Sequence, residues 1–312
     1  MMFIIYTNTC ISNKCIKVCF FTSLFVLMGF TTKAFAQQEY AWWNEKHNWD
    51  GHMHWSRMMR ISPGYMGPNA LPVPQMLDGR IPERNRSEIG FSSFHSLGEI
   101  TLSSFGNVFY SIAQGLASFE VNHIFLEYYK TDTLLRDERI ARSEHVEGWA
   151  VGDLSVTTTL TLIKDRKWPD MVLRAGFRTT SGSKLSDARY TDAPGHYFDL
   201  SFGKNLWENE ALDQSIRLFW SGGIYIWQIS YPDNRQNDAI LAGIGLSWNK
   251  GNHLLSAETT GYFGYRNERD QPIVQRIRYQ YSFDRIGLRV WYQKGLHDVY
   301  HHNLNISIVY FW

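Results

Sequence analysis

The sequence predicts an all-β fold, a transmembrane antiparallel β-barrel of about twelve strands with an irregular N-terminal segment. Three observations lead to this prediction: 15 % of the 312 residues are aromatic, the mean hydropathy is −0.31, and apolar and polar residues alternate along many short segments. A helical membrane protein needs apolar runs of roughly 20 residues. A strand between lipid and a wet lumen needs only alternation, because successive side chains point to opposite faces.

Positive and negative charges are nearly balanced, with 31 Lys and Arg against 30 Asp and Glu. A protein that binds polyanions through its overall electrostatic field carries a large positive excess. We therefore expect no nucleic-acid partner.

Residues 1–36 are predicted to be a secretory signal peptide. Lys14 and Lys17 accompany an apolar run over residues 18–30, and Ala34-Phe35-Ala36 matches the small-x-small cleavage pattern. An N-terminal anchor helix is the alternative, but so short a run spans a bilayer poorly. All three cysteines lie in this segment, so the mature chain would have no thiol nucleophile, disulfide or thiolate zinc ligand.

The last strand carries the strongest signal. Its alternating apolar face ends on an aromatic residue, which resembles the C-terminal signal by which Gram-negative outer-membrane barrels are recognised for assembly. We expect Ile308, Tyr310 and Trp312 to form this assembly signal. The expected partners are the barrel-assembly machinery, outer-membrane lipid and lipopolysaccharide. A strand of a soluble sandwich would alternate in the same way, but it gives no reason to end on Trp312.

Twelve strands are expected, an even number as single-chain bacterial barrels require, although ten or fourteen remain open. Gly222-Gly223 marks an expected bulge or kink. Longer connections face the exterior in such barrels, so loop parity places 131–151 and 180–196 outside, and residue 37 and Trp312 in the periplasm. The expected strands are 88–96, 99–111, 118–130, 152–163, 169–179, 197–206, 214–229, 239–249, 254–266, 273–283, 286–296 and 303–312.

Residues 37–87 do not alternate and are interpreted as a separate segment ahead of the barrel at 88–312. They contain five of the nine prolines, which excludes a strand ladder or a helix interior. We expect a periplasmic strap or a plug in the barrel mouth, held by its tryptophans. A disordered tail is the alternative, which the tryptophan content disfavours.

Charged residues on the polar faces of the expected strands are candidates to line the lumen. Arginines there would attract anionic solutes, because a guanidinium presents a planar fork to a carboxylate. The alternative is that arginine–carboxylate pairs fill a closed lumen in place of water. The candidates are Arg174, Arg178, Arg217, Arg276, Arg278 and Arg289, with Glu120, Asp199 and Glu258.

No catalytic residue, metal site or cofactor is expected. His47, His52 and His54 lie close in sequence, but nothing in their spacing fixes a coordination geometry. Lipid-modifying barrels have a His-x-Ser pair on one strand face, and this sequence has none; His95 and Ser96 are adjacent and point to opposite faces. His301-His302 is expected to be a solvated turn.

Four stretches, residues 152–160, 169–177, 180–182 and 197–204, carry a family resemblance. They resemble uncharacterised outer-membrane barrels grouped with transporters of the phenol-degradation meta pathway. Those proteins have Pro-Thr-Gly where this chain has Thr180-Ser181-Gly182. The resemblance implies an outer-membrane barrel with a transport role, and it carries over no binding residue.

Together these features predict a barrel in the outer membrane of a Gram-negative bacterium. The expected function is passage or capture of a small solute, anionic or aromatic in character. The alternatives are a lipid-modifying outer-membrane hydrolase, and a plugged barrel with a structural or surface-binding role.

Overall fold

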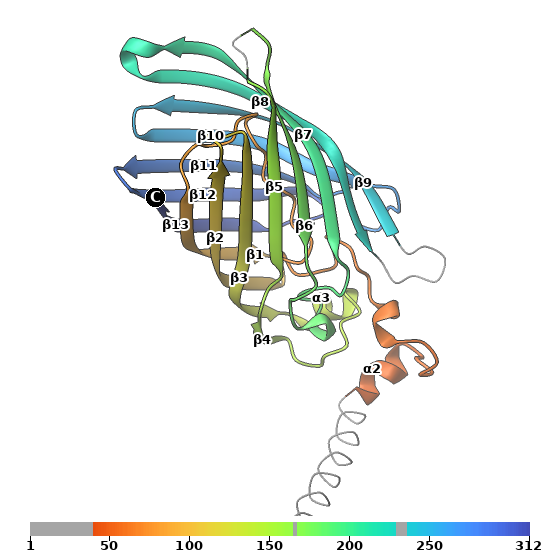
Figure 1. Cartoon of the computed structure of the whole chain (residues 1–312). Coiled ribbons are helices and arrows are strands. Elements are labelled where there is room, and N and C mark those ends of the chain that lie inside the picture. Colours follow the sequence, from red (N-terminus) through yellow and green to blue (C-terminus); the bar gives the residue numbers. More distant parts are fainter. Residues whose placement is uncertain (1–39, 165–166, 229–235) are drawn as a thin grey trace, which may run out of the picture. The chain divides into compact units, whose positions relative to one another are not determined.

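The computed structural model describes residues 40–164, 167–228 and 236–312, and most of them belong to one antiparallel β-barrel (Figure 1). Twelve strands form the ring, which closes where β1 (Arg86–Ser96) pairs with β13 (His302–Phe311). A thirteenth strand, β4 (Glu147–Ala150), pairs only with β3 (Ala117–Thr131) beside the ring. The prediction of a twelve-stranded antiparallel barrel is confirmed.

Each of the twelve expected strands corresponds to one strand of the ring. No helix among the described residues is long and apolar enough to cross a membrane. The predicted signal peptide and all three cysteines lie outside the described residues. The remaining ring strands are β2 (Glu99–Ile112), β5 (Leu154–Ile163), β6 (Asp170–Arg178), β7 (Gly195–Asn209), β8 (Gln214–Gln228), β9 (Gln236–Lys250), β10 (His253–Gly264), β11 (Ile273–Phe283) and β12 (Ile286–His297).

The helices are short. In the described part of the chain two are α-helices, α2 (Ala41–Lys46) and α3 (Thr133–Glu138), and three are 3-10 helices at Trp55–Met58, Leu185–Asp187 and Glu210–Leu212. The described residues up to His52 belong to a separate compact unit, in which Trp43 is buried and its ring lies 6.2 Å from that of Trp49.

The strands of the ring place apolar side chains outward and polar ones inward. On β13, Leu304, Ile306 and Ile308 are 47–53 % exposed, whereas the residues between them are at most 3 % exposed. This exposure is the reverse of a soluble core, and it suits a barrel whose outer face meets lipid and whose inner face is polar. The expected bulge at Gly222-Gly223 is wrong, because the register of β8 with both neighbours continues through these residues. The irregularity lies in the facing strand β7, between Asn205 and Trp207.

The two ends of the ring differ in the length of their connections. At one end, the short-turn rim, the strands are joined over 113–116, 164–169, 210–213, 251–252 and 284–285. The other end, the long-loop rim, contains connections 97–98, 132–153, 179–194, 265–272 and 298–301. Residues 229–235, between β8 and β9 in sequence, lie outside the described residues. Two connections depart from the expected pattern of long outward loops: the two-residue turn at 97–98, and 298–301, which has the same length as the turns at 113–116 and 210–213.

Residues 53–85, here called the inner segment, pass through the ring from the long-loop rim to the short-turn rim (Figure 1). At the long-loop rim, Gly67 N donates to the Ala188 carbonyl at 2.8 Å. At the short-turn rim, Trp312 N donates to the Asn85 carbonyl at 3.1 Å. The segment therefore begins and ends at opposite rims of the barrel.

Loop parity places residue 37 on the same side as Trp312, and this expectation lies outside the described residues. Among the described residues, the inner segment begins at the rim opposite Trp312. Loop parity counts only crossings made by strands. The inner segment makes one further crossing in extended, proline-rich conformation, which no strand pattern reports.

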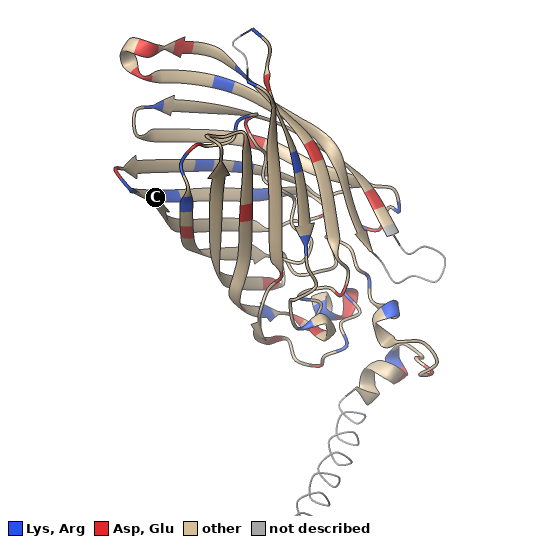
Figure 2. Ribbon diagram, in the orientation of Figure 1, with Lys and Arg blue, Asp and Glu red and all other residues tan. Residues whose placement is uncertain are grey.

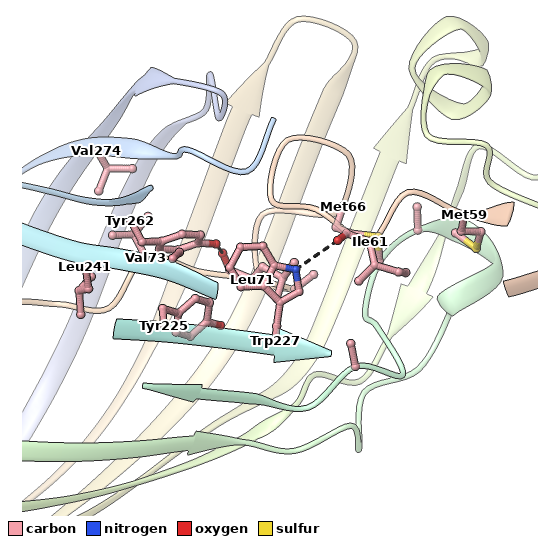
Figure 3. Close-up of a cluster of buried hydrophobic side chains, with 14 of the residues drawn as sticks. Met59, Ile61, Met66, Leu71, Val73, Tyr225, Trp227, Leu241, Tyr262 and Val274 are labelled. Atoms are coloured by element: carbon pink, nitrogen blue, oxygen red, sulfur yellow. Dashed lines mark hydrogen bonds between the residues drawn. The ribbon is translucent and has the colours of Figure 1, made fainter. Parts of the chain in front are cut away.

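The hydrophobic core lies inside the barrel, between the inner segment and the wall formed by β8–β11 (Figure 3). Met59, Ile61, Met66, Leu71 and Val73 of the inner segment belong to it. They pack with aromatic and aliphatic side chains of the wall, namely Tyr225, Trp227, Leu241, Tyr262 and Val274. Tyrosine and tryptophan suit such a core because their polar atoms still find partners. Trp227 Nε1 donates to the Ile61 carbonyl at 3.2 Å, and the Tyr262 hydroxyl donates to the Leu71 carbonyl at 2.8 Å.

We expect cysteines introduced at Arg57 and Glu144 to be labelled on one side of the membrane, and a cysteine at Asn252 on the other. The first two positions are exposed near the long-loop rim, and Asn252 is exposed in the turn between β9 and β10. The measurement is labelling of single-cysteine variants by an impermeant maleimide, on intact and on lysed cells. Labelling of Arg57→Cys together with Asn252→Cys would overturn the threaded path.

Candidate functional site

All nine charged residues expected to line the lumen lie on the inward faces of their strands. Figure 2 shows that positively and negatively charged positions are spread along the strands of the ring. Six of them are at most 6 % exposed, and three are partly exposed inside the barrel. The six are Arg174, Arg178, Arg217, Arg276, Asp199 and Glu258; the three are Arg278, Arg289 and Glu120.

A cavity of about 300 Å³ remains between the inner segment and the wall that runs from β11 through β13 and β1 to β7. Its charged lining residues are five arginines and two glutamates: Arg86, Arg174, Arg276, Arg278, Arg289, Glu88 and Glu120. Arg86 and Glu88 are missing from the residues expected from sequence, because β1 alternates weakly. Even-numbered residues of β1, such as Ser92 and Phe94, point into the barrel. Arg86 and Glu88 are also even-numbered, so the alternation of β1 places them inward as well.

Most of the cavity's arginines are paired with a carboxylate. Arg174 contacts Asp199 at 2.7 Å, and Arg86 contacts Glu120 at 3.1 Å. Arg289 is paired with Glu88. Such pairs hold the side chains in place and leave little unpaired charge in the buried wall.

Arg278 is held more loosely than the other cavity arginines. Its Nη2 lies 4.0 Å from the Glu258 carboxylate, which Arg276 already contacts at 2.9 Å. Its Nε donates to Ser256 Oγ at 3.3 Å, and a quarter of its side chain is exposed. A guanidinium has five N–H donors, so Arg278 keeps donors for a solute.

Other arginines bind the backbone of the inner segment. Arg276 donates to the Val73 carbonyl at 2.5 Å and to the Pro74 carbonyl at 3.1 Å, and Arg174 donates to the Gln75 carbonyl at 2.7 Å. An extended segment without a strand partner has carbonyls that need donors from elsewhere. These arginines therefore fix the segment and line the cavity at the same time.

Arg178 and Arg217, two of the expected lumen residues, do not line this cavity. Arg217 lies toward the short-turn rim, where it contacts Asp170 at 2.7 Å and donates to the Asp78 carbonyl at 2.8 Å. Arg178 lies toward the long-loop rim and contacts Asp153 at 2.5 Å. Both arginines join neighbouring elements through ion pairs. This is the role that lumen arginines have in the alternative interpretation, in which ion pairs fill the lumen.

A buried network at the long-loop rim was not expected from the sequence. Arg189, in the loop between β6 and β7, is fully buried and contacts Glu99 and Glu127, and Arg139 contacts Glu99 at 2.5 Å. Burial alone would lower the pKa of Arg189, but Glu127 and Glu99 outweigh it and hold that pKa above its ordinary value. The network folds both long loops inward over the mouth of the barrel.

His301 lies beside this network, and the expectation that it is part of a solvated turn is wrong. Its ring is 9 % exposed and packs edge-on against Phe94, with 6.3 Å between the ring centroids. Burial lowers the pKa of His301 to about 4; Glu99 opposes this shift, and Arg139 and Arg189 add to it. The ring is therefore neutral near pH 7.

We expect the wild-type barrel to lose more thermal stability between pH 7 and pH 4.5 than the His301→Gln variant. A histidine whose folded pKa is depressed stabilises the fold above its unfolded pKa of about 6.5, and this contribution is lost as the pH falls toward 4. The difference should be about 2 kcal/mol at pH 4.5. The measurement is the temperature at which the folded form disappears on unboiled gels. Equal losses in both proteins would contradict a buried, neutral His301.

The outward face of β1 contains a serine–histidine pair that does not follow the His-x-Ser pattern. Ser93 Oγ and His95 Nε2 lie 2.7 Å apart, in the reverse order Ser-x-His. A nucleophilic serine also needs donors for the oxyanion, which backbone N–H groups often supply. Here β1 is paired without interruption to β13 and β2 on both sides of Ser93, so its backbone donors are occupied. The pair alone does not make an acyl-transfer site.

Within the described part of the chain, no three His, Cys, Asp or Glu side chains are grouped so as to hold a metal ion. Of the three histidines noted in the sequence, His54 bonds Ser56 Oγ through Nδ1 at 2.8 Å and caps the short helix that follows.

The three residues of the expected assembly signal lie on the outward face of β13, next to the short-turn rim. Trp312 packs near Tyr110 of β2, with 6.0 Å between ring centroids, and its Nε1 donates to Ser87 Oγ of β1 at 3.2 Å. Trp312 therefore covers the seam where the first and last strands close the ring.

We expect deletion of Trp312 to lower the amount of folded protein in outer-membrane fractions. The physical reason is the loss of the terminal aromatic residue that packs across the β1–β13 seam. The measurement is the heat-modifiable band on gels of membrane fractions. Trp168→Ala is the control, since Trp168 is an exposed tryptophan in a turn of the same rim. Undiminished folded protein after the deletion would refute the role of Trp312.

The sequence matches no protein-family profile and no curated protein. Among solved structures, the barrel is similar to the COG4313 outer membrane channel from Pseudomonas putida F1, with a TM-score of 0.53, 12 % identity, and coverage of 78 % of this chain and 97 % of that chain. For the KdgM porin the TM-score is 0.42 and the identity 10 %, and the match covers 72 % of this chain and 98 % of that chain. For the β domain of the Bordetella autotransporter BrkA the TM-score is 0.41 and the identity 14 %, and the match covers 73 % of this chain and 99 % of that chain.

The likeness to the channel of Pseudomonas putida shows the fold, a barrel of the kind found in outer-membrane channels. At 12 % identity it concerns the fold alone. The resemblance to transporters of the phenol-degradation meta pathway finds no matching family.

Proposed function

We propose that this protein is an integral barrel of the Gram-negative outer membrane that passes or captures small anionic solutes. The outward face supports the location, because its exposed aliphatic and aromatic side chains would be costly in water and suit lipid. The ring strands have 9 to 15 residues, and a tilted membrane-spanning strand needs about 9–11. Lipopolysaccharide, outer-membrane lipid and the assembly machinery are the partners that this location implies.

The observation that carries the proposed function is the lining of the cavity, where five arginines stand against two glutamates. Charges in a narrow space with low-dielectric walls act at close range and are screened weakly by salt. Four of the five arginines are matched by the carboxylates of Glu120, Asp199, Glu258 and Glu88, so the excess positive charge rests on Arg278. This guanidinium, with donors to spare, favours entry of anions.

The inner segment sets the size of the solute. It occupies the side of the lumen next to β8–β11 and leaves about 300 Å³ on the other side, the lower end of the range for small-molecule sites. The barrel would therefore admit small molecules and exclude folded polymers. We propose a role without catalysis, supported by the occupied backbone donors around Ser93.

We expect reversal potentials in planar bilayers under a salt gradient to show anion selectivity, and Arg278→Gln to lower the anion-to-cation permeability ratio about threefold. Arg278 suits this test better than Arg276, because replacing Arg276 would also release the carbonyls of the inner segment. The measurement compares wild type, Arg278→Gln and the control Arg285→Gln, which removes an exposed arginine from the turn between β11 and β12.

Cation selectivity of the wild-type barrel would contradict the proposed preference. Absence of conductance would contradict passage and leave capture as the only form of the proposal. An equal effect of Arg285→Gln and Arg278→Gln would assign the selectivity to the rim and not to the cavity.

A further inference from the structure

One part of the cavity wall gathers several polar side chains around a tryptophan. Here called the Trp291 platform, it consists of Arg276, Arg278, Trp291, Gln293, Asn303 and Asn305. The register places Arg276, Gln293 and Asn303 in one row across β11, β12 and β13. Arg278, Trp291 and Asn305 form the adjacent row. Directly opposed residues have Cβ atoms about 5 Å apart, so the six side chains form a continuous surface.

The side-chain amide of Asn303 has no hydrogen-bond partner among the described residues, although the residue is completely buried. Both its Oδ1 and its Nδ2 are unpaired, and so is Oδ1 of Asn305, whose Nδ2 donates to Ser92 Oγ at 2.7 Å. A buried amide without partners costs about 1–3 kcal/mol per polar atom. Amides placed in this way at a cavity wall are suited to a ligand with groups that both donate and accept, as hydroxyls do.

The other members of the platform supply a charge and a flat apolar face. Trp291 lies opposite Arg278 on the neighbouring strand, and the Arg276 guanidinium lies 6.0 Å from the centre of its ring. Arg276 is committed to Glu258 and to the inner segment, whereas Arg278 keeps free donors. The platform therefore offers a guanidinium suited to a carboxylate, at Arg278, beside an aromatic face suited to the apolar face of a ring, at Trp291.

We propose that the Trp291 platform binds a cyclic, polyhydroxylated carboxylate, that is, a sugar acid. This inference rests on the proposed function and names the class of anion. The carboxylate binds Arg278, the ring lies on Trp291, and hydroxyl groups bind the amides of Asn303 and Asn305, which turn toward the ligand. An inorganic anion would use only Arg278, and an apolar acid would leave the amides unpaired.

Three probes of matched shape separate these contributions. Glucuronate has the ring, the hydroxyls and the carboxylate; cyclohexanecarboxylate lacks the hydroxyls; glucose lacks the charge. Binding of each to the purified, detergent-solubilised barrel is measured by titration calorimetry. We expect glucuronate to bind at least about tenfold more tightly than either of the others, since two or more hydrogen bonds are at stake.

Asn303→Leu is the decisive variant, because it removes the amide and changes no charge. It should lower the affinity for glucuronate about tenfold and leave that for cyclohexanecarboxylate unchanged. A leucine is compatible with this buried position, and folding is checked by heat modifiability. The matched control is Ser247→Ala, which alters a buried inward residue of β9 outside the cavity lining. Arg278→Gln is a second variant that should weaken both acids and leave glucose unaffected.

Equal affinities of glucuronate and cyclohexanecarboxylate, absence of binding by all three probes, or an unchanged affinity in Asn303→Leu would each overturn the inference. Reversal potentials distinguish this failure from failure of the proposed function. An anion-selective barrel without a preference for glucuronate keeps the proposed function and loses the sugar-acid site. A barrel that binds glucuronate but does not conduct keeps the site and loses passage.

Discussion

Arginine side chains that donate to the main chain of the inner segment are the interaction on which the barrel interior depends. The segment is extended and rich in proline, so it has carbonyl groups and few ways of pairing them with its own donors. Arg174, Arg217 and Arg276 supply donors from three strands of the wall, and each also contacts a carboxylate. Segment and wall are thereby joined in one hydrogen-bonded network.

The same requirement explains the electrostatic character of the cavity. Arginines placed on the wall to hold the segment also face the space beside it, so structural and functional roles are combined in Arg174 and Arg276. Arg278 differs from them because it forms no hydrogen bond with the inner segment and only a distant ion pair with Glu258. Arg278 therefore has hydrogen-bond donors that no structural contact uses, and these are available to a solute.

The strands could be predicted from the sequence because the surroundings of a barrel impose a local rule. Every strand separates an apolar from a polar side, and the resulting alternation is visible within ten residues, as in β13. The rule also placed the charged residues inward, although it could not tell which of them face the cavity. Arg178 and Arg217 point inward just as Arg278 does. They differ from Arg278 in the carboxylates that they contact, and these lie on other parts of the sequence.

The path of the inner segment could not be predicted in this way, because its partners lie far away in the sequence. Arg276 and Val73 are 203 residues apart, and no pattern near either residue indicates the other. The buried surroundings of His301 and Asn303 likewise depend on loops and strands from the other end of the chain. The Ser93–His95 pair was accessible to sequence reasoning, and only the order of its residues concealed it.

The threaded path has a consequence for how the ring is made. The inner segment leads directly into β1, and β1 pairs with β13 over its length to close the seam. While that seam is intact, the segment cannot swing out sideways as a hinged plug does. It can leave only lengthwise, with its N-terminal end drawn back through the lumen. Closing the β1–β13 seam around a segment already in place is therefore the simplest order of assembly.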